Sequence, residues 1–218
     1  MSAAASAGAG SADEGLRLIL ASASPARLAT LRSAGLTPEV VVSDVDEDAF
    51  TATDVPGLVA QLAQAKASAV FHRIGGTGDV VVIGCDSLLE IDGEPMGKPS
   101  DAAQARERWL LMRGRTGSLH TGHHLVARLA GEQMSTAAVA TTQVAFADLS
   151  DEEVDAYIAT TEPLRVAGAF TIDGLGGAYV TGISGDPHNV VGISLPLLRR
   201  MLGGLGVAWH SLWDPAAG

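Results

Sequence analysis

Cysteine is nearly absent from this 218-residue sequence, because Cys85 is the only one. A single cysteine cannot form a disulfide within the chain, and it leaves no set of thiolates that could hold zinc. Cys85 also lies inside an apolar run, which predicts a buried, unreactive thiol rather than a nucleophile. The sequence therefore indicates a reducing compartment, and we expect the protein in the cytoplasm.

Positive charge is scarce too. Lys and Arg number 14 against 25 Asp and Glu, which gives a formal net charge of −11 at pH 7. So acidic a chain is not expected to bind nucleic acid or an anionic membrane surface through its overall charge. An anionic ligand would have to be held by a locally basic pocket.

Long hydrophobic runs are missing, although 47% of the residues are hydrophobic. No stretch reaches the ~18 apolar residues of a membrane-spanning helix, and the Ala/Ser/Gly-rich residues 1–14 lack the basic start of a signal peptide. The length suits one α/β domain with its own core. We predict a disordered leader at residues 1–14 and a single domain over residues 15–213.

The common phosphate-binding signatures are absent as well. The sequence contains neither Gly-x4-Gly-Lys-Ser/Thr nor Gly-x-Gly-x-x-Gly, so P-loop and Rossmann dinucleotide sites lose their main support. A phosphate site would have to be built from other residues.

One suitable segment lies near the N-terminus. The apolar run Leu16–Leu20 predicts a short buried strand, and Ser24 can cap a helix that begins at Pro25 and ends near Gly35. A serine-rich turn between a strand and a helix presents N–H groups and hydroxyls at a helix N-terminus, where the helix dipole favours an anion.

The rest of the chain alternates strand and helix patterns. Asp79–Cys85 indicates a central strand with Asp86 and Ser87 at its carboxyl end, where open α/β sheets bind ligands. Asp92-Gly93 predicts a hairpin, and Ser150-Asp-Glu-Glu153 predicts a capping box. Further strands are expected at residues 38–43, 118–130, 135–146 and 178–183, and further helices at 55–73, 100–113, 151–160 and 195–202.

Cationic and acidic side chains recur together along this pattern: Arg27, Glu47, Lys66, Asp86 and Lys98. A polyphosphate with a bound metal needs both, because Arg and Lys neutralise phosphate oxygens while Asp and Glu hold a hard cation or activate water. Taken singly, each has a plain structural alternative, such as a solvated surface charge or a turn residue. Together they predict a site able to cleave a phosphoanhydride.

Several motifs carry a resemblance to a known family. The run from Leu18 to Arg27 resembles L-A-S-x-S-P-R-R, which opens the Maf proteins, the nucleoside triphosphate pyrophosphatases. Gly84-Cys-Asp-Ser87 followed by Gly97-Lys-Pro99 is similar to the A-D-T…K-P block of that family. The segments Ala167–Gly176 and Asn189–Leu197 resemble the Gly-rich motif and the closing motif of the family. All of these motifs occur in the same order as in the family.

The resemblance implies a Maf-like (ITPase-like) α/β fold, with a mixed, twisted sheet and two lobes flanking a central cleft. It implies a homodimer that hydrolyses a nucleoside triphosphate to the monophosphate and pyrophosphate, with Mg²⁺ or Mn²⁺ and water attack at the α-phosphate. By motif position, Asp86 corresponds to the residue that accepts the proton in the family. Glu47 and Asp86 correspond to the carboxylates that bind the metal. The residues implied to bind the phosphates are Ser22, Ser24, Arg27, Lys66 and Lys98.

Three positions that sort substrates within the family are unusual here. They are Ala26 in place of the first Arg of S-P-R-R, Ser87 in place of Thr, and Asp173 in place of Gln. Asp173 can accept hydrogen bonds but cannot donate them as Gln does. We therefore expect no strict preference for dTTP or UTP. Nor is Ala26 the bulky aromatic residue of the branch that takes 7-methyl-GTP.

The histidines and tryptophans offer further candidates. Gly117 stands where the family commonly has His, and we expect that role to be lost rather than taken over by His120. Of His120, His123 and His124, only the first and last share a strand face, and no carboxylate is expected nearby, so metal ligation is not expected. Trp109 and Trp209 are expected in the core or at an interface.

Two alternatives from other classes stay open at this stage. One is a non-catalytic nucleotide-binding regulator of cell division, since Maf proteins are also linked to inhibition of septum formation. This alternative stays open because Ala26 and Gly117 differ from the residues that the family has at these positions. The other is a phosphatase that releases orthophosphate from a sugar or nucleoside phosphate.

Overall fold

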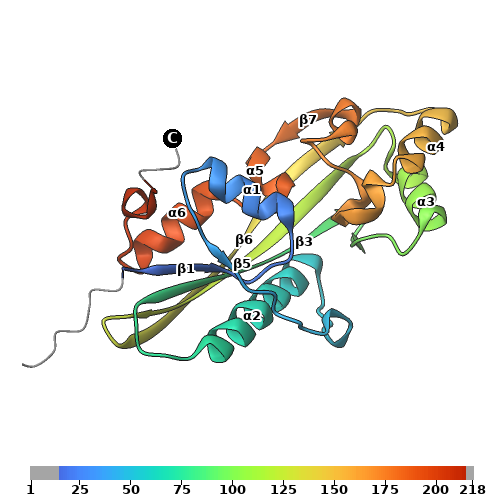
Figure 1. Cartoon of the computed structure of the whole chain (residues 1–218). Helices are drawn as coiled ribbons and strands as arrows, with labels where there is room; N and C mark the ends of the chain where they lie inside the picture. The colour runs from blue at the N-terminus through green and yellow to red at the C-terminus, as the bar shows by residue number, and fades with distance from the viewer. Residues whose placement is uncertain (1–14, 215–218) are drawn as a thin grey trace, which may run out of the picture.

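The computed structural model describes residues 15–214. The predicted leader at residues 1–14 lies outside the described residues. The strands of the described part form one seven-stranded sheet in the order β2-β1-β3-β5-β6-β7, with β4 paired to β3 beside that path (Figure 1). The strands are β1 (Arg17–Leu20), β2 (Glu39–Val40), β3 (Val80–Ile91), β4 (Glu94–Met96), β5 (Thr116–Leu129), β6 (Glu132–Phe146) and β7 (Val180–Ser184).

Helices cover both faces and one end of this sheet. Figure 1 places α1, α5 and α6 on one side of the strands, α2 on the other, and α3 with α4 at the far end. The α-helices are α1 (Pro25–Ser33), α2 (Val55–Ile74), α3 (Ala102–Met112), α4 (Asp151–Ala159), α5 (Pro187–Val191) and α6 (Leu195–Gly204). Short 3₁₀ turns are η1 (Glu47–Ala49), η2 (Glu162–Arg165), η3 (Ala167–Ala169), η4 (Leu175–Tyr179) and η5 (Trp209–Leu212).

The sheet is mixed, as the sequence predicts. β1 runs parallel to β2 and to β3, whereas β3 is antiparallel to β4 and β5. The pairing of β1 with β3 ends at Leu20 and Ile83, and the pairing with β4 begins only at Leu89. Among the described residues, positions 84–88 of β3 therefore have no neighbouring strand on that edge.

The prediction that the central strand ends near Cys85 is wrong. β3 continues to Ile91 because β5 pairs with it from Val80 to Glu90 without a break. Asp86 consequently lies in the middle of β3 rather than beyond its end. It nevertheless sits just past the end of β1, so the expected opening at a strand end is supplied by the neighbouring strand.

Other predicted elements have their expected types. Ser24 caps α1, and Ser150 forms the capping box with Glu153. The hairpin at Asp92-Gly93 joins β3 to β4. The strand expected at residues 38–43 is only two residues long, and the short helix α5 lies between β7 and α6, where no helix was predicted.

The apolar core is divided into two lobes that share the long strands. In one lobe, clusters fill both faces of the sheet, one beneath α1 and α6 and the other beneath α2. In the other, Trp109 is fully buried and its ring meets Phe146, Tyr157 and Tyr179 edge to face. Trp109 thus has the core position that was expected, and Trp209 packs at the margin of the first lobe.

Two glycines let α2 lie directly on the sheet. A Cβ built on Gly84 would stand 2.2 Å from the carbonyl oxygen of Ala63, and one on Gly122 would stand 2.1 Å from that of Val59. No side chain fits at either position because backbone already occupies the space. Gly122 is also the β5 partner of Asp86, so this close packing fixes α2 beside the acidic residue.

Candidate functional site

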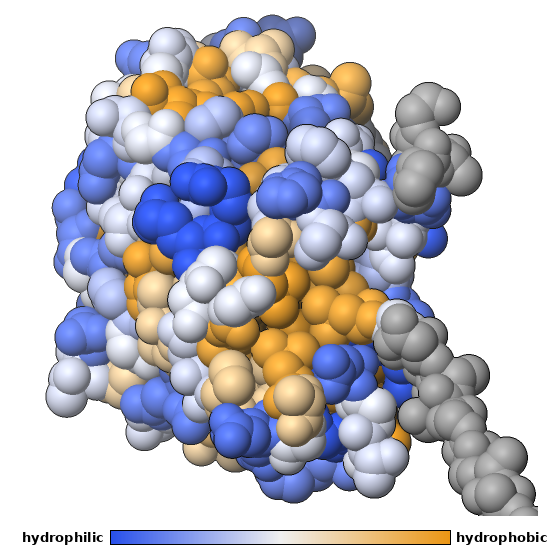
Figure 2. Space-filling model, turned by 90° about the vertical axis from the view of Figure 1, so that its left-hand side faces the viewer, coloured by the Kyte–Doolittle hydropathy of each residue, from blue (hydrophilic) through white to orange (hydrophobic). Residues whose placement is uncertain are grey.

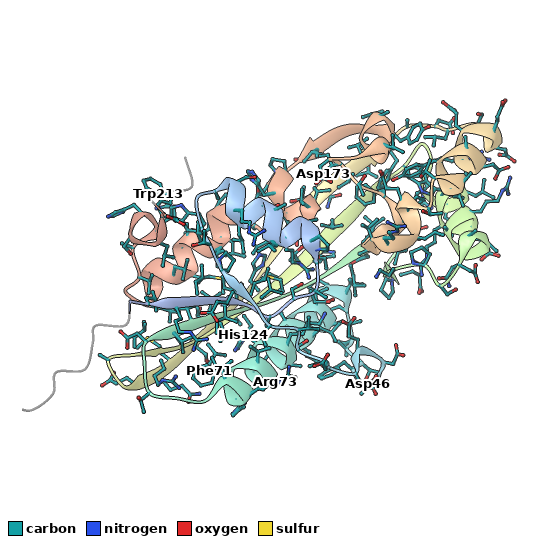
Figure 3. The ribbon with its side chains drawn as sticks, in the orientation of Figure 1. Asp46, Phe71, Arg73, His124, Asp173 and Trp213 are labelled. Atoms are coloured by element: carbon teal, nitrogen blue, oxygen red, sulfur yellow. The ribbon has the colours of Figure 1, made fainter. Side chains whose placement is uncertain are left out.

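A cleft of about 1160 Å³ contains every residue that the sequence analysis proposed for the site. It extends from the turn before α1, past the edge of β3, to the segment that precedes β7. Figure 3 labels Asp173 above the sheet and Asp46, the neighbour of Glu47, below it. The proposed residues that line the cleft are Ser22, Ser24, Ala26, Arg27, Glu47, Lys66, Asp86, Ser87, Lys98 and Asp173.

Lys66 joins two carboxylates of this cleft, Glu47 and Asp86. Its Nζ lies 2.6 Å from Oδ1 of Asp86 and 2.7 Å from Oε1 of Glu47. The side chains of Lys66 and Asp86 are each 10% exposed, whereas that of Glu47 is 55% exposed. α2, resting on Gly84 and Gly122, delivers this ammonium group to the edge of β3.

The Asp86 carboxyl group has a raised pKa. Burial disfavours its charged form and outweighs the attraction of Lys66 and Arg27, with Glu47 adding to the rise. A carboxylate whose pKa exceeds its usual value takes up a proton more readily than an ordinary aspartate. This property suits a group that removes a proton from water.

Arg27 is held in place at the opposite wall. Its Nε donates to the carbonyl oxygen of Gly192 at 2.7 Å, Nη1 to Ser22 Oγ at 3.0 Å and Nη2 to Ser87 Oγ at 2.9 Å. A guanidinium has five N–H donors, so two remain for a ligand. The buried position fixes the direction in which those donors point.

The serine turn has the local structure that its sequence predicts. Ser22 Oγ accepts from the backbone N–H of Ser24, and Ser24 Oγ accepts from the N–H of Arg27 as the N-cap of α1. Because each hydroxyl acts as an acceptor in these bonds, each keeps its own proton to donate. The turn can therefore offer hydroxyl donors to an anion.

Lys98 enters the cleft on the loop after β4. Its side chain has no hydrogen-bond or ion-pair partner within residues 15–214. The loop itself is fixed, because the carbonyl oxygen of Gly97 accepts from the N–H of Gly168 and from Arg108. An unpaired ammonium on an anchored loop is available to an anionic ligand.

The donor set fits a hard divalent cation only with help from a ligand. Within the described residues no group of three or more His, Cys, Asp or Glu could hold a metal ion. Glu47 and Asp86 do supply carboxylate oxygens on either side of Lys66. Mg²⁺ commonly binds through one or two carboxylates together with substrate phosphates, and this pair is suited to that arrangement.

The histidines are arranged differently from the expectation. His120 does have a carboxylate beside it, because Nε2 lies 3.0 Å from Oε2 of Glu90 on the adjacent strand. The sequence could not indicate this contact, since 30 residues separate the two. A side chain at Gly117 would meet Leu89 and Glu90 at about 3 Å, so β5 has no room there for the family histidine.

Cys85 has the inert character that was predicted. It is fully buried in β3, and burial raises the pKa of its thiol to about 12. The thiolate needed for nucleophilic chemistry is therefore not formed near neutral pH.

Sequence reasoning missed several residues of the cleft. It did not find that Ser87 and Gly192 hold Arg27, because both partners are far from Arg27 in the chain. It also passed over Glu162, whose carboxylate accepts four hydrogen bonds at the far end of the cleft. The Thr-Thr-Glu-Pro sequence around Glu162 resembles an ordinary exposed turn, so no local signal marked it.

A mixed α/β sheet whose cleft brings Arg27, Lys66 and Lys98 together with Glu47 and Asp86 defines a protein able to hold a polyanionic ligand. Among residues 15–214, no helix has the length and apolar content that a membrane span requires. Comparison of the sequence with models of known protein families identifies the family of this chain. The chain belongs to the Maf-like protein family, which matches residues 17–205.

Curated proteins from several bacteria are similar to this chain over most of its length. A protein of Salinispora tropica named nucleoside triphosphate pyrophosphatase is 54% identical over 201 residues, which cover 91% of this chain and 88% of that protein. One of the same name from Streptomyces coelicolor is 52% identical, covering 92% and 96%. Among solved structures, the Staphylococcus aureus Ham1 protein matches with a TM-score of 0.42 and 12% identity, over 90% of this chain and 93% of that one.

Proposed function

We propose that this chain hydrolyses a nucleoside triphosphate to the nucleoside monophosphate and pyrophosphate. The observation that carries the proposal is a single cleft in which Arg27, Lys66 and Lys98 meet Glu47 and Asp86. Membership of the Maf-like family and the names of the relatives from Salinispora tropica and Streptomyces coelicolor support the same reaction.

The cationic and hydroxyl groups bind the triphosphate in this proposal. Ser22 and Ser24 donate their hydroxyl protons, and Arg27 uses the two N–H groups that the protein leaves unpaired. Lys98 adds a positive charge from the opposite loop. These groups stabilise the negative charge that collects on the departing pyrophosphate.

Asp86 accepts the proton of the attacking water. The water oxygen forms a bond to the α-phosphorus, and the bond from that phosphorus to the bridging oxygen of the β-phosphate breaks. Lys66, 2.6 Å from Oδ1, orients the carboxylate during this transfer. The raised pKa of Asp86 brings the proton affinity of this carboxylate closer to the range in which a general base is effective.

A divalent cation, Mg²⁺ or Mn²⁺, completes the proposal. Glu47 and Asp86 would hold it together with phosphate oxygens of the substrate. Such an ion polarises phosphoryl oxygens and lowers the pKa of bound water. Lys66 keeps the two carboxylates close to each other without a ligand.

Base selection is assigned to Ala26, Ser87 and Asp173. The hydroxyl of Ser87 is already engaged, because it accepts from Arg27 and shares a hydrogen bond with Thr121. Asp173 is exposed and offers acceptors only. The protein is therefore proposed to accept more than dTTP and UTP.

A panel of nucleoside triphosphates tests the reaction, each incubated with Mg²⁺, Mn²⁺ or a chelator. Pyrophosphate with monophosphate, formed only in the presence of metal, supports the proposal. Orthophosphate would instead support a phosphatase. Binding without any product would support the non-catalytic regulator of cell division.

Substitution of the proposed base gives the sharpest single test. Asp86→Asn removes the proton acceptor and should lower the rate of pyrophosphate release by about 10²–10⁴-fold. Asp92→Asn, in the exposed hairpin turn at the end of the same strand, is the matched control and should leave the rate unchanged. Activity that survives Asp86→Asn nearly intact would remove Asp86 from the mechanism.

We also propose a cytoplasmic homodimer. The single buried cysteine supports a reducing compartment. Figure 2 shows hydrophobic side chains gathered on one side of the molecule, which would suit burial against a second copy. Light scattering should give twice the mass of one chain, and a monomer at micromolar concentration would contradict the assembly.

A further inference from the structure

The carboxylate of Glu162 organises the far end of the cleft. Its Oε1 accepts hydrogen bonds from Thr171 Oγ1 at 2.6 Å, Tyr157 OH at 2.9 Å and the N–H of Gly176 at 3.0 Å. Its Oε2 accepts from the N–H of Leu175 at 3.0 Å. One side chain thus joins α4 to both ends of the segment 171–176.

The segment is packed closely around this carboxylate. A Cβ on Gly174 would lie 2.6 Å from Oε2 of Glu162, and one on Gly176 would lie 2.3 Å from the hydroxyl of Tyr157. Only glycine allows the backbone to approach so near. The glycines that the sequence analysis noted in this motif therefore have a specific steric reason.

Glu162 is an acceptor and not an acid or base. Although burial acts in the opposite direction, hydrogen bonds from Thr171, Leu175, Gly176 and Tyr157 lower its pKa to about 2. The group stays ionised throughout the neutral range, and both of its oxygens are engaged. It has no proton to give, and both of its oxygens already accept hydrogen bonds, so its contribution is to hold the chain in place.

The segment that Glu162 holds presents Asp173 to the cleft. Asp173 lies between Thr171 and Leu175, is exposed, and has no hydrogen-bond or ion-pair partner within residues 15–214. The negative charge of Asp173 repels phosphates, which the proposed function assigns to Arg27 and Lys98; a further cation that lines the cleft, Arg165, is exposed. The neighbouring lining residues Phe170, Ile172 and Leu175 are apolar, as a planar base requires.

From this geometry we infer that Glu162 is a positioning residue that sets the base preference of the cleft by fixing the segment that carries Asp173. The inference rests on the proposed function for its substrate class, a nucleoside triphosphate. Among residues 15–214, neither Arg27 nor Lys98 is hydrogen-bonded to Glu162, so we expect phosphate binding at these two cations not to depend on Glu162.

The experiment compares nucleotides with inorganic tripolyphosphate, which has the phosphates but no base. For Glu162→Gln we expect KM for the preferred nucleoside triphosphate to rise about tenfold, the preference among purine and pyrimidine triphosphates to flatten, and kcat to change little. Inhibition by tripolyphosphate should keep its wild-type constant. Thr171→Val removes one donor to Glu162 and should show a smaller change in the same direction.

Glu153→Gln is the control, since Glu153 caps the neighbouring helix α4 and lies outside the cleft. An unchanged order of bases with an unchanged KM in Glu162→Gln and Thr171→Val would overturn the inference. Parallel weakening of nucleotide and tripolyphosphate binding would overturn it too, because that indicates general damage. A wild-type protein that binds nucleotides without releasing pyrophosphate would contradict the proposed function. In that case the dissociation constants of the nucleotides, compared between the wild type and Glu162→Gln, still test the inference.

Discussion

Arg27 links three distant parts of the chain through a single side chain. Its guanidinium contacts the serine turn at Ser22, the strand β3 at Ser87 and the backbone of Gly192. Lysine carries the same charge but cannot make three bonds in a fixed plane. The shape of the group is therefore as important as its charge.

Arg27→Lys should consequently impair the enzyme although the charge is kept. Loss of one or more charge-assisted hydrogen bonds, worth about 1.5–3 kcal/mol each, predicts a fall in kcat/KM of about 10–100-fold. Arg32→Lys, on the exposed face of the same helix, should have no effect. Steady-state kinetics of pyrophosphate release distinguish the two, and equal values would show that Arg27 acts through charge alone.

At the scale of elements, the packing of α2 on the sheet decides where Lys66 lies. Gly122→Ala places a methyl group about 2.1 Å from the carbonyl oxygen of Val59, so α2 must move. We expect a loss of about 1–3 kcal/mol in the free energy of unfolding, as for other overpacked sites. Activity should fall as well, because Lys66 moves away from Asp86.

Gly203→Ala provides the comparison for that variant. A Cβ at Gly203, in helix α6, would have no neighbour within 4 Å. The change should raise stability by about 0.5–1 kcal/mol. Urea denaturation measures both variants, and a Gly122→Ala protein as stable and active as the wild type would contradict the packing argument.

Much of this architecture could be predicted from the sequence. The serine turn with its cap at Ser24, the hairpin at Asp92-Gly93 and the capping box at Ser150 all depend on neighbouring residues, and the structure contains them. The length of β3 could not be predicted in this way. It depends on pairing with β5, which begins 25 residues after β3 ends.

In the candidate site, too, some residues could be predicted from local sequence and others could not. Asp86 was identified because its motif, Gly84–Ser87, is local, and Lys66 through the resemblance to the family. The gap on the edge of β3 that exposes Asp86 depends instead on where β1 and β4 end. Glu162 was missed because its four partners come from α4 and from a segment about ten residues later. Long-range contacts of this kind leave no periodic pattern.

For the whole molecule, His123 couples folding to pH. Burial lowers its pKa from the usual 6.5 to about 4. The neutral ring donates from Nδ1 to the carbonyl oxygen of Thr121 and accepts at Nε2 from the N–H of Ser194, the N-cap of α6. A proton on Nε2 would oppose that second bond.

Stability should therefore decline as the pH falls from 6.5 to 4. Below pH 6.5 the unfolded chain binds a proton at this residue and the folded chain does not, so the loss reaches about 3 kcal/mol by pH 4. His124, whose pKa burial also lowers, acts with the same sign, whereas the raised pKa of Asp86 opposes it. Glu162, with its pKa of about 2, loses its contribution only below pH 4.5.

Urea titrations between pH 7.5 and 5 measure this dependence with little interference from Glu162. Replacement of the exposed His210 by Gln should not alter the slope, and replacement of His123 by Gln should reduce it. A free energy of unfolding that stays constant over this range would contradict the neutral, buried state of His123.

The two lobes are joined by β3 and β5, which run through both without interruption. Within residues 15–214, any widening of the cleft between the two lobes must therefore bend the hydrogen-bonded ladder of β3 and β5. Substrate entry and product exit are expected to rely on exposed side chains at the rim, such as Glu47 and Lys98, because hydrogen bonds hold the backbone of the Lys98 loop and of the Asp173 segment. The rate of turnover would then depend on side-chain movements at the rim of the cleft and not on a rotation of the two lobes.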